Sequence, residues 1–332
     1  MDLKILVNKM GKVKYNSKRM RFLKLRERNR KKQIESDNLS RRKMILKHLL
    51  KKKLLSMREL TSFLKQVDKG QDYVTFGKIG NFKYIVVADG HGGNKTIFRI
   101  RQLNWASILS SDNFADLIFA EITALGNTST DGATLTIIKI FDGPDAHIDV
   151  YWAGDSSAKI YKDGQEIYHT NDHDINNAEE MKRMQTMGIN MKNCDKLCAK
   201  TSDVITQLPS AYFWFTNIIK LNMTHSIGHN NVTGKFLSHD RIPIKRSPDG
   251  NSIYKVVVGS DGFWDMMCPD DIHFIAEQSN TASILGNLAL TRWNKKWHFI
   301  RDAFNGKPAV NVLNQSLGLG DDVSVGCFVG LF

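Results

Sequence analysis

The sequence predicts a mixed α+β domain that follows a strongly basic N-terminal arm. Beyond Gly70, short runs rich in β-branched and aromatic residues alternate with stretches whose apolar residues repeat at helical spacing. Charge divides the chain at a similar point. Residues 1–65 hold 22 Lys and Arg against 5 Asp and Glu, whereas the rest of the chain holds 25 against 29. The arm therefore carries a net charge of +17 and the rest −4, so the high isoelectric point comes from the arm alone.

Length and composition indicate a globular protein, since 332 residues with 42% hydrophobic content can fill a core. No apolar run approaches the roughly 20 residues of a membrane span, and the first residues do not resemble a signal peptide. We therefore expect an intracellular protein, cytoplasmic or nuclear. The four cysteines are too few for a disulfide framework, which agrees with a reducing compartment. We also expect a monomer.

The arm, residues 1–66, has two parts. Residues 1–40 hold too few apolar side chains to form a core, so we expect disorder or nascent helix there. Over 41–66, leucines and other apolar residues recur at helical spacing between lysines, which predicts a basic amphipathic helix. That helix is a candidate to dock on the domain at 67–332. It is also a candidate to bind an acidic protein as a calmodulin target does, an acidic membrane surface, or nucleic acid.

Within the domain, residue patterns predict the elements in order. The predicted strands lie at 73–76, 84–88, 134–141, 147–153, 159–161, 255–259 and 323–329. The predicted helices lie at 94–109, 114–125, 177–187, 269–278 and 281–304.

The strand at 84–88 ends in the sequence DGHGG at 89–93, which places chemistry-bearing groups at one end of a sheet. Asp89 offers the hard oxygen that Mg²⁺ and Mn²⁺ prefer, and Gly90 has no side chain to keep its carbonyl from the same ion. His91 is an adjacent proton donor.

Three further strands end or begin at acidic turns. These turns are AGD at 153–155, GSDG at 259–262 and GDD at 320–322. Asp-Gly turns are common between strands, so a single one carries little information. Four carboxylate-bearing turns with glycine for close approach are what a multi-ion site with oxygen ligands requires.

In this order, the motifs resemble those of the metal-dependent Ser/Thr protein phosphatases of type 2C. The resemblance covers residues 67–332 and leaves the arm outside. It rests on QD at 71–72, DGHGG at 89–93, DGAT at 131–134, AGDSSA at 153–158, TNDH at 170–173, EMKRM at 180–184, SDGFWD at 260–265 and DDVSV at 321–325.

The resemblance implies a four-layer α/β/β/α sandwich in which two antiparallel sheets are flanked by helices, with a metal cluster at one end. It also implies hydrolysis of phosphoserine and phosphothreonine in phosphoprotein substrates, with two Mn²⁺ or Mg²⁺ ions and a weaker third. By motif, Asp89 would bridge two ions and Gly90 would offer its carbonyl. Asp261 and Asp321 would complete the first ion's ligands, and Asp155 would belong to the third.

The chemistry implied by the resemblance is attack by a bridging, metal-bound hydroxide on phosphorus, because two divalent ions lower the pKa of the water between them. His91 would then protonate the departing Ser or Thr oxygen. Asp72 corresponds to the aspartate of the family's N-terminal "(E/Q)D" element and joins His91 in the predicted catalytic set. No cysteine nucleophile is needed.

Three positions depart from the family pattern. Val67 stands where the family usually has a phosphate-clamping Arg, which leaves Lys69 as the nearby cation for substrate binding. His225 and His229 replace an Arg and an Asp, so we expect weak accessory-metal binding. These departures keep a second hypothesis open, a pseudophosphatase that serves as a scaffold or binding module with a basic targeting arm. A third hypothesis, nucleic-acid binding as the main function, rests on the arm alone.

Overall fold

The computed structural model describes residues 59–67, 70–199, 205–246, 252–301, 309–316 and 321–332, together with residues 33, 41 and 42. The chain divides into two compact units, Met1–Met57 and Arg58–Phe332. Most of the predicted arm, and Lys69, therefore lie outside the described residues. The second unit contains the sheets and the candidate site.

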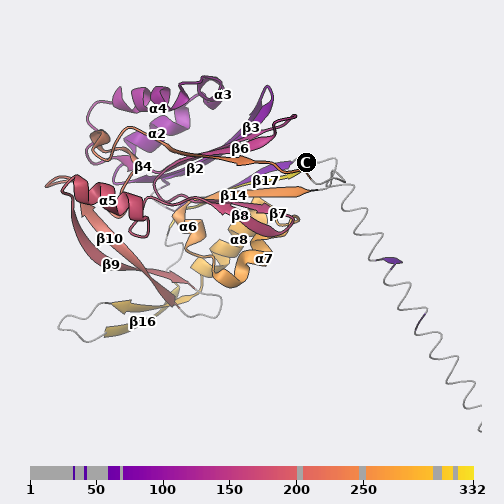
Figure 1. The fold of residues 1–332 in the computed structure, drawn as a ribbon. Coiled ribbons are helices and arrows are strands. Elements are labelled where there is room, and N and C mark those ends of the chain that lie inside the picture. The colour runs from indigo at the N-terminus through magenta and orange to yellow at the C-terminus, as the bar shows by residue number, and fades with distance from the viewer. Residues whose placement is uncertain are drawn as a thin grey trace, which may run out of the picture. The chain divides into compact units, whose positions relative to one another are not determined.

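Two antiparallel sheets form the centre of this unit (Figure 1). The seven-stranded sheet has the order β12 (Ile227–Gly228), β4 (Gly132–Ala133), β3 (Phe82–His91), β5 (Leu135–Phe141), β6 (His147–Ala153) and β13 (Ser238–Pro243), with β2 (Asp72–Ile79) also paired to β3. The five-stranded sheet has the order β1 (Glu59–Lys65), β17 (Val323–Leu331), β14 (Ile253–Gly259), β7 (Ala158–Lys162) and β8 (Gln165–His169).

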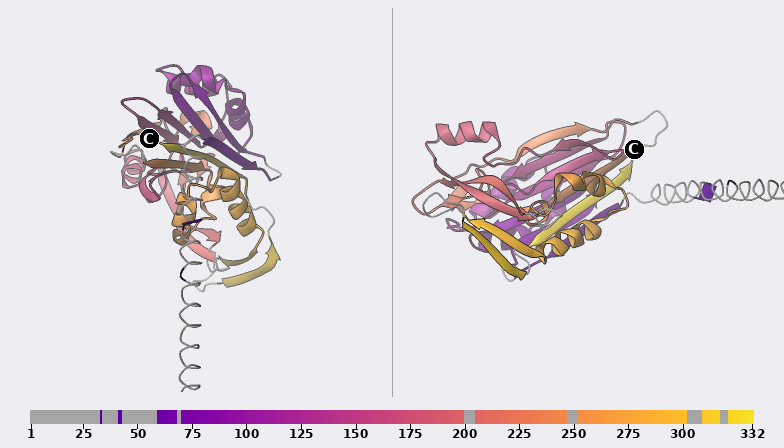
Figure 2. Two further views of the ribbon diagram at one scale, coloured as in Figure 1. Left: turned by 90° about the vertical axis from the view of Figure 1, so that its right-hand side faces the viewer. Right: turned by 90° about the horizontal axis from the view of Figure 1, so that it is seen from below.

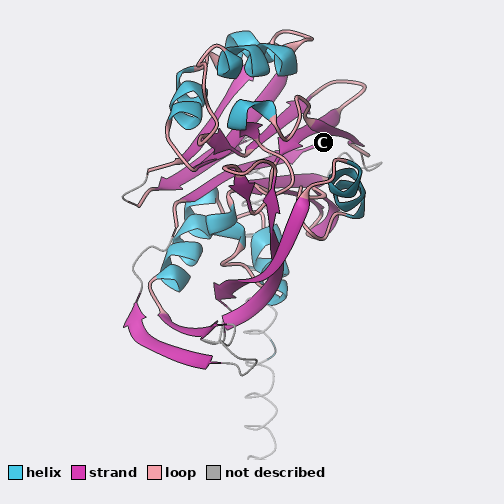
Figure 3. Ribbon diagram, turned by 90° about the vertical axis from the view of Figure 1, so that its left-hand side faces the viewer, coloured by secondary structure: helices cyan, strands magenta, loops and turns pink. Residues whose placement is uncertain are grey.

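Helices cover the outer face of each sheet, which gives the expected four-layer α/β/β/α sandwich. Figures 2 and 3 show the layers from other directions. On the seven-stranded sheet lie α2 (Lys95–Gln102), α3 (Trp105–Leu109) and α4 (Phe114–Thr123). On the five-stranded sheet lie α6 (Asp261–Trp264), α7 (Ile272–Ala276) and α8 (Ala282–Trp293), with the 3₁₀ turn η2 (Pro269–Asp271).

The remaining elements extend from this sandwich. They are α5 (Ala178–Thr186), the strands β9 (Asn190–Ala199), β10 (Ile205–Trp214) and β11 (Lys220–Leu221), the short turn η1 (His229–Asn231), and the hairpin of β15 (Lys296–Arg301) and β16 (Ala309–Ser316). Among the described helices, none combines the length and the apolar character needed to cross a membrane.

Alternation along the central strands divides the apolar side chains among three core layers. On β3, Ile85 and Val87 point into the layer between the two sheets, whereas Val86 and Ala88 point toward the helices α2–α4. On β17, Phe328 lies in the layer between the sheets, while Cys327 faces the helices of the other side. Because successive strand residues face opposite sides, a continuous apolar run is buried on both faces.

Three sequence-based predictions are wrong in the described residues. The predicted helix over 94–109 is divided into α2 and α3 by Leu103 and Asn104, since Leu103 is extended and Asn104 caps α3.

The predicted helix over 41–66 does not reach Gln66, because Glu59–Lys65 forms β1, which pairs with β17 along its whole length. The Thr61 hydroxyl oxygen accepts a hydrogen bond from the backbone N–H of Ala282 at the start of α8. Sheet pairing therefore overrides the helical spacing, and the domain begins before residue 67.

The predicted helix over 281–304 is also too long. It ends at Trp293, and residues 296–301 form β15. The sequence WHFI at 297–300 combines aromatic and β-branched residues, which favour a strand once a hairpin partner is present.

Candidate metal and catalytic site

The site begins with two carboxylates on neighbouring strands. Asp72, the first residue of β2, lies directly opposite Asp89 near the end of β3. Asp72 is only 1% exposed, and its Oδ2 atom accepts a hydrogen bond of 2.7 Å from the Ser260 hydroxyl. Within the described part of the chain, its Oδ1 atom is buried and has no hydrogen-bond partner. A buried acceptor of this kind needs a cation or a proton donor.

The predicted acidic residues act on one another electrostatically. Burial raises the pKa of Asp89 well above its usual range, and repulsion from Asp72, Asp261, Asp321 and Asp155 raises it further. Burial also raises the pKa of Asp72 to about 7, against the opposing effect of the Ser260 hydroxyl, and Asp261 adds to the rise. Asp89 therefore lies within electrostatic reach of the four other predicted carboxylates.

Small side chains hold the DGHGG segment in place. A Cβ atom on Gly90 would lie 2.8 Å from the Cβ of Ile97 on α2, so this position requires glycine. The backbone N–H of Asp89 donates to the Thr134 hydroxyl oxygen at 3.0 Å. That hydroxyl is 2.6 Å from the hydroxyl of Ser156, the neighbour of Asp155. Through these hydroxyls, the DGAT and AGDSSA motifs support the acidic ends of β3 and β6.

Asp322 has a structural role that sequence reasoning missed. Its carboxylate accepts hydrogen bonds from the backbone N–H groups of Val67, Gln71 and Asp72. These bonds fix the turn that leads into β2, so Asp322 positions Asp72. The adjacent Asp321 was predicted as a metal ligand. Its charge helps to raise the pKa of Asp89. The sequence shows two consecutive aspartates, and nothing in it distinguishes this role of Asp322 from that of Asp321.

A cation absent from the predicted set lies at the same turn. Val67 occupies the position where an Arg was expected, and Lys69 is outside the described residues. Arg101 of α2 donates through Nη2 to the carbonyl oxygen of Gly70, and to that of Asp72 at 2.9 Å. Arg101 therefore braces the turn from the helix side. The role of Lys69 in substrate binding stays a prediction.

His91 contacts a second imidazole. Its Nδ1 atom is 3.1 Å from Nε2 of His229, and the two rings stack with centroids 4.9 Å apart. The Nδ1 atom of His229 is 3.1 Å from the carbonyl oxygen of Ser129. Burial and the neighbouring His229 lower the pKa of His91 to about 3, and burial also lowers the pKa of His229. Both rings are therefore neutral at neutral pH in the metal-free protein.

The turn that carries His229 has an uncommon backbone conformation. His229, Asn230 and Asn231 all have positive φ angles, of 48°, 53° and 57°. Hydrogen bonds to residues 127–131 hold this turn. The backbone N–H of His229 donates to the carbonyl oxygen of Asp131 at 2.8 Å, and Oδ1 of Asn230 accepts from the N–H of Thr128 at 2.8 Å. Left-handed conformations cost energy in non-glycine residues, so the surrounding contacts must over-determine them.

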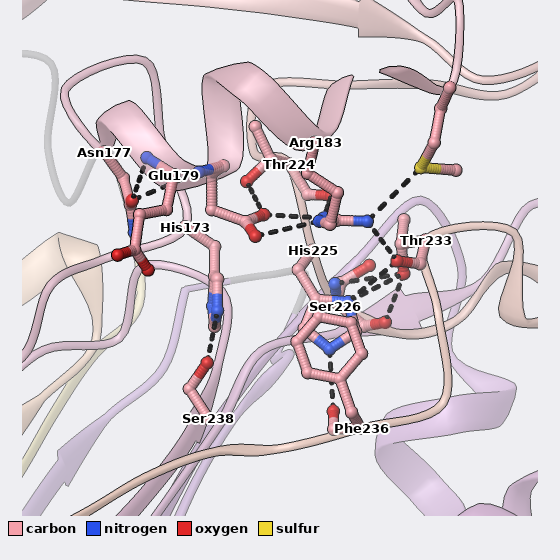
Figure 4. Close-up of polar contacts among 12 residues, drawn as sticks. His173, Asn177, Glu179, Arg183, Thr224, His225, Ser226, Thr233, Phe236 and Ser238 are labelled. Atoms are coloured by element: carbon pink, nitrogen blue, oxygen red, sulfur yellow. Dashed lines mark hydrogen bonds and ion pairs between the residues drawn. The ribbon is translucent and has the colours of Figure 1, made fainter. Parts of the chain in front are cut away.

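A polar network from α5 supports the same segment (Figure 4). Arg183 forms a two-pronged ion pair with Glu180, at 2.8 and 2.6 Å, and donates to the carbonyl oxygens of Thr224 and Thr233. The hydroxyl of Thr224 completes the group by donating to Glu180. The EMKRM motif therefore serves here to fasten the segment 224–233.

Two buried histidines complete this network (Figure 4). Nε2 of His225 is 2.8 Å from the carbonyl oxygen of Phe236, and its ring stacks on the Phe236 ring at 4.1 Å. His173 accepts a hydrogen bond at Nδ1 from the N–H of Gly154, next to Asp155. Burial lowers the pKa of His173 to about 3 and that of His225 to about 4. His225 thus packs as a neutral ring where the family has a charged Arg.

The donor set fits divalent cations of the Mg²⁺ and Mn²⁺ type, because it consists of carboxylate oxygens that repel one another at the end of a sheet. The buried and unpartnered Oδ1 of Asp72 supports this fit. Among the described residues, no three Asp, Glu, His or Cys side chains are already gathered tightly enough to enclose a single ion. The weak accessory-metal binding expected from His229 stays a prediction.

The solved structures that resemble this chain at low identity include the following three. A Caenorhabditis elegans sex determining protein is 15% identical with a TM-score of 0.50, and the match covers 82% of this chain but only 64% of that one. The Streptococcus agalactiae serine/threonine phosphatase is 19% identical with a TM-score of 0.49, over 82% and 99%. The catalytic domain of the phosphatase PstP, solved in complex with two manganese ions, is 15% identical with a TM-score of 0.43, over 82% and 98%.

Sequence comparison with curated proteins gave no match. Comparison with family models gave one that covers most of the chain, since the description Protein phosphatase 2C matches residues 34–292. The matched stretch contains the turns with Asp72, Asp89, Asp155 and Asp261. The chain therefore belongs to the protein phosphatase 2C family.

Proposed function

We propose that this protein hydrolyses phosphoserine and phosphothreonine in proteins with the help of two Mn²⁺ or Mg²⁺ ions. The observation that carries the proposal is that four other carboxylates, those of Asp72, Asp155, Asp261 and Asp321, lie close enough to repel Asp89. Buried like charges destabilise a fold unless something neutralises them, and divalent cations do so. Membership of the phosphatase family supports the same conclusion.

In this proposal, Asp89, the carbonyl of Gly90, Asp261 and Asp321 would hold the two principal ions, and Asp155 a weaker third. When bound, the ions would lower the pKa of a water between them and neutralise phosphoryl charge. Asp72 would contribute its buried carboxylate beside Asp89.

The phosphorus–oxygen bond to the Ser or Thr breaks as the water oxygen bonds to phosphorus. The departing oxygen needs a proton, and His91 is the predicted donor. The products are the free hydroxyl and inorganic phosphate. Because the described site provides an imidazole and carboxylates, a covalent cysteine intermediate is not part of the proposal.

The basic arm, residues 1–57, would direct this activity. Its lysines and arginines favour acidic partners, and nucleic acid, an acidic membrane surface and an acidic protein all remain candidates. The domain boundary in this proposal lies at residue 58, because β1 belongs to the sheet.

Release of phosphate from a phosphothreonine peptide tests the proposal. We expect turnover with Mn²⁺ and its loss in EDTA, with recovery when Mn²⁺ is restored in excess. Mn²⁺ binding without turnover would instead support the pseudophosphatase hypothesis. A phosphotyrosine peptide is the matched control substrate, and its preferred hydrolysis would contradict the proposed specificity.

A further inference from the structure

The hydrogen-bond partners of His91 and His229 determine which of the two rings donates and which accepts. A carbonyl oxygen only accepts hydrogen bonds, so the contact of His229 Nδ1 with the Ser129 carbonyl, at 3.1 Å, places the proton on Nδ1. A neutral imidazole carries one proton, so Nε2 of His229 has a lone pair. That lone pair faces Nδ1 of His91 at 3.1 Å. His91 therefore donates from Nδ1 to His229.

This direction leaves Nε2 of His91 as the atom through which a proton is exchanged. The Nε2 atom is buried, and no described residue forms a hydrogen bond with it. If His91 instead carried its single proton on Nε2, two lone pairs would face each other at 3.1 Å. The pairing with His229 excludes that arrangement.

The residues around His91 and His229 leave space for the two rings and hold them in contact. A Cβ atom on residue 132 would lie 2.2 Å from Nε2 of His229 and 2.6 Å from Cε1 of His91, so only glycine admits both rings. The left-handed turn at 229–231 carries an energetic cost, and bonds to residues 127–131 hold it. Arg183 fastens the same segment from α5.

We propose that His229 is a positioning residue for His91. It accepts a hydrogen bond from Nδ1 of His91, fixes the ring and its tautomer, and leaves Nε2 of His91 unprotonated. Because Nε2 then has a lone pair, His91 would take the proton that the attacking water releases and pass it to the departing Ser or Thr oxygen, while the bond from Nδ1 to His229 keeps the ring in one orientation. The expected effect on kcat rests on the proposed phosphatase function, whereas the tautomer of His91 does not.

The first test is independent of turnover. ¹⁵N NMR of the metal-free full-length protein distinguishes protonated from unprotonated imidazole nitrogens, and the loss of signals in His91→Gln assigns those of His91. We expect the wild type to show His91 protonated at Nδ1 and unprotonated at Nε2. We expect His229→Phe, which keeps a ring of similar shape but no acceptor, to lose this single tautomer. The opposite tautomer in the wild type, or an unchanged one in His229→Phe, would overturn the proposal.

The second test is kinetic. His229→Phe should lower kcat about 10- to 100-fold with KM changed less than about twofold, because proton transfer contributes to the chemical step. His229→Gln places an oxygen acceptor near the position of Nε2 and should restore kcat to within about threefold of the wild type. His169→Phe, at an exposed site on β8, is the control. Equal losses in the Phe and Gln variants, both folded by circular dichroism, would indicate packing alone and overturn the positioning role.

Failure of the proposed function is distinguishable from failure of this inference. If the wild type releases no phosphate but shows the expected His91 tautomer, which His229→Phe abolishes, the pairing stands and the phosphatase proposal is wrong. If the wild type is active and the tautomer result is reversed, the positioning role is wrong and the phosphatase proposal stands.

Discussion

Asp72 and Asp89 face each other directly across strands β2 and β3, so two carboxylates occupy opposing positions at one end of the sheet. Like charges in such a pair destabilise a sheet. At a pH above the Asp72 pKa of about 7, Asp72→Asn should therefore raise the free energy of unfolding of the EDTA-treated protein, by about 1 kcal/mol. It should also reduce the rise in Tm that Mn²⁺ produces. Thermal unfolding with and without Mn²⁺ measures both effects, and a variant less stable than wild type in EDTA would contradict this account.

The position of β1 predicts where the chain can be shortened. Removal of residues 1–57 should leave a folded domain, whereas removal of 1–66 deletes an entire strand of the five-stranded sheet. The longer deletion also exposes core side chains beneath Phe63, whose ring packs against Gly286 of α8. At 1.5–3 kcal/mol for each buried apolar side chain, the loss should be about 3 kcal/mol or more. Urea unfolding of the two truncated proteins compares them, and equal midpoints would show that β1 contributes nothing.

The arm itself should bind polyanions in a salt-dependent manner. Residues 1–57 carry a net charge of +16 and the remainder carries −3, so the full chain should bind heparin or acidic vesicles at low salt and the 58–332 fragment should not. Released counterions make such binding fall steeply with ionic strength. Affinity measured at two salt concentrations tests this prediction. Retention of binding by the fragment would locate the polyanion site elsewhere.

Two buried histidines should make the fold acid-sensitive. His173 and His225 have pKa values lowered to about 3 and about 4, whereas in the unfolded chain they titrate near 6.5. Between about pH 4 and 6.5 the unfolded state binds more protons, so stability falls as the pH falls. From pH 7 to 5, each histidine should cost about 2 kcal/mol of unfolding free energy.

Replacement of His173 measures its own contribution to this pH dependence. His173→Asn keeps an acceptor near Nδ1 for the N–H of Gly154 and removes one titrating group, so its stability should fall less between pH 7 and 5. Gln165→Ala, at an exposed position on β8, removes no titrating group and is the control, so its pH dependence should equal that of the wild type. An unchanged slope in His173→Asn would mean that His173 has the same pKa in the folded and unfolded states, which would contradict this account.

The sequence predicted the central strands well because they are buried on both faces. The run 84–88 is continuously apolar, and 323–329 is apolar except for Ser324 and Gly326; both form buried strands, β3 and β17. The prediction failed where a tertiary partner decides the conformation. Residues 59–65 carry leucines at helical spacing, yet pair with β17, and residues 296–301 pair with β16.

For the site, motifs identified the acidic turns, but they could not show which side chains support them. Asp322 and Asp321 are adjacent and chemically identical, and only the fold shows that Asp322 accepts three backbone N–H groups. The contact between His91 and His229 joins residues 138 positions apart. It depends on a left-handed turn of non-glycine residues, for which the sequence carries no reliable signal.

The most direct test of the metal-dependent phosphatase account is Mn²⁺-dependent phosphate release by wild type and Asp261→Asn, with Asp145→Asn at an exposed loop as control. Replacing one carboxylate by a neutral amide weakens the binding of a divalent ion. We expect activity in wild type and Asp145→Asn, and its loss in Asp261→Asn, with the same circular dichroism spectrum for all three. Full activity of Asp261→Asn, or of the wild type in EDTA, would contradict the account.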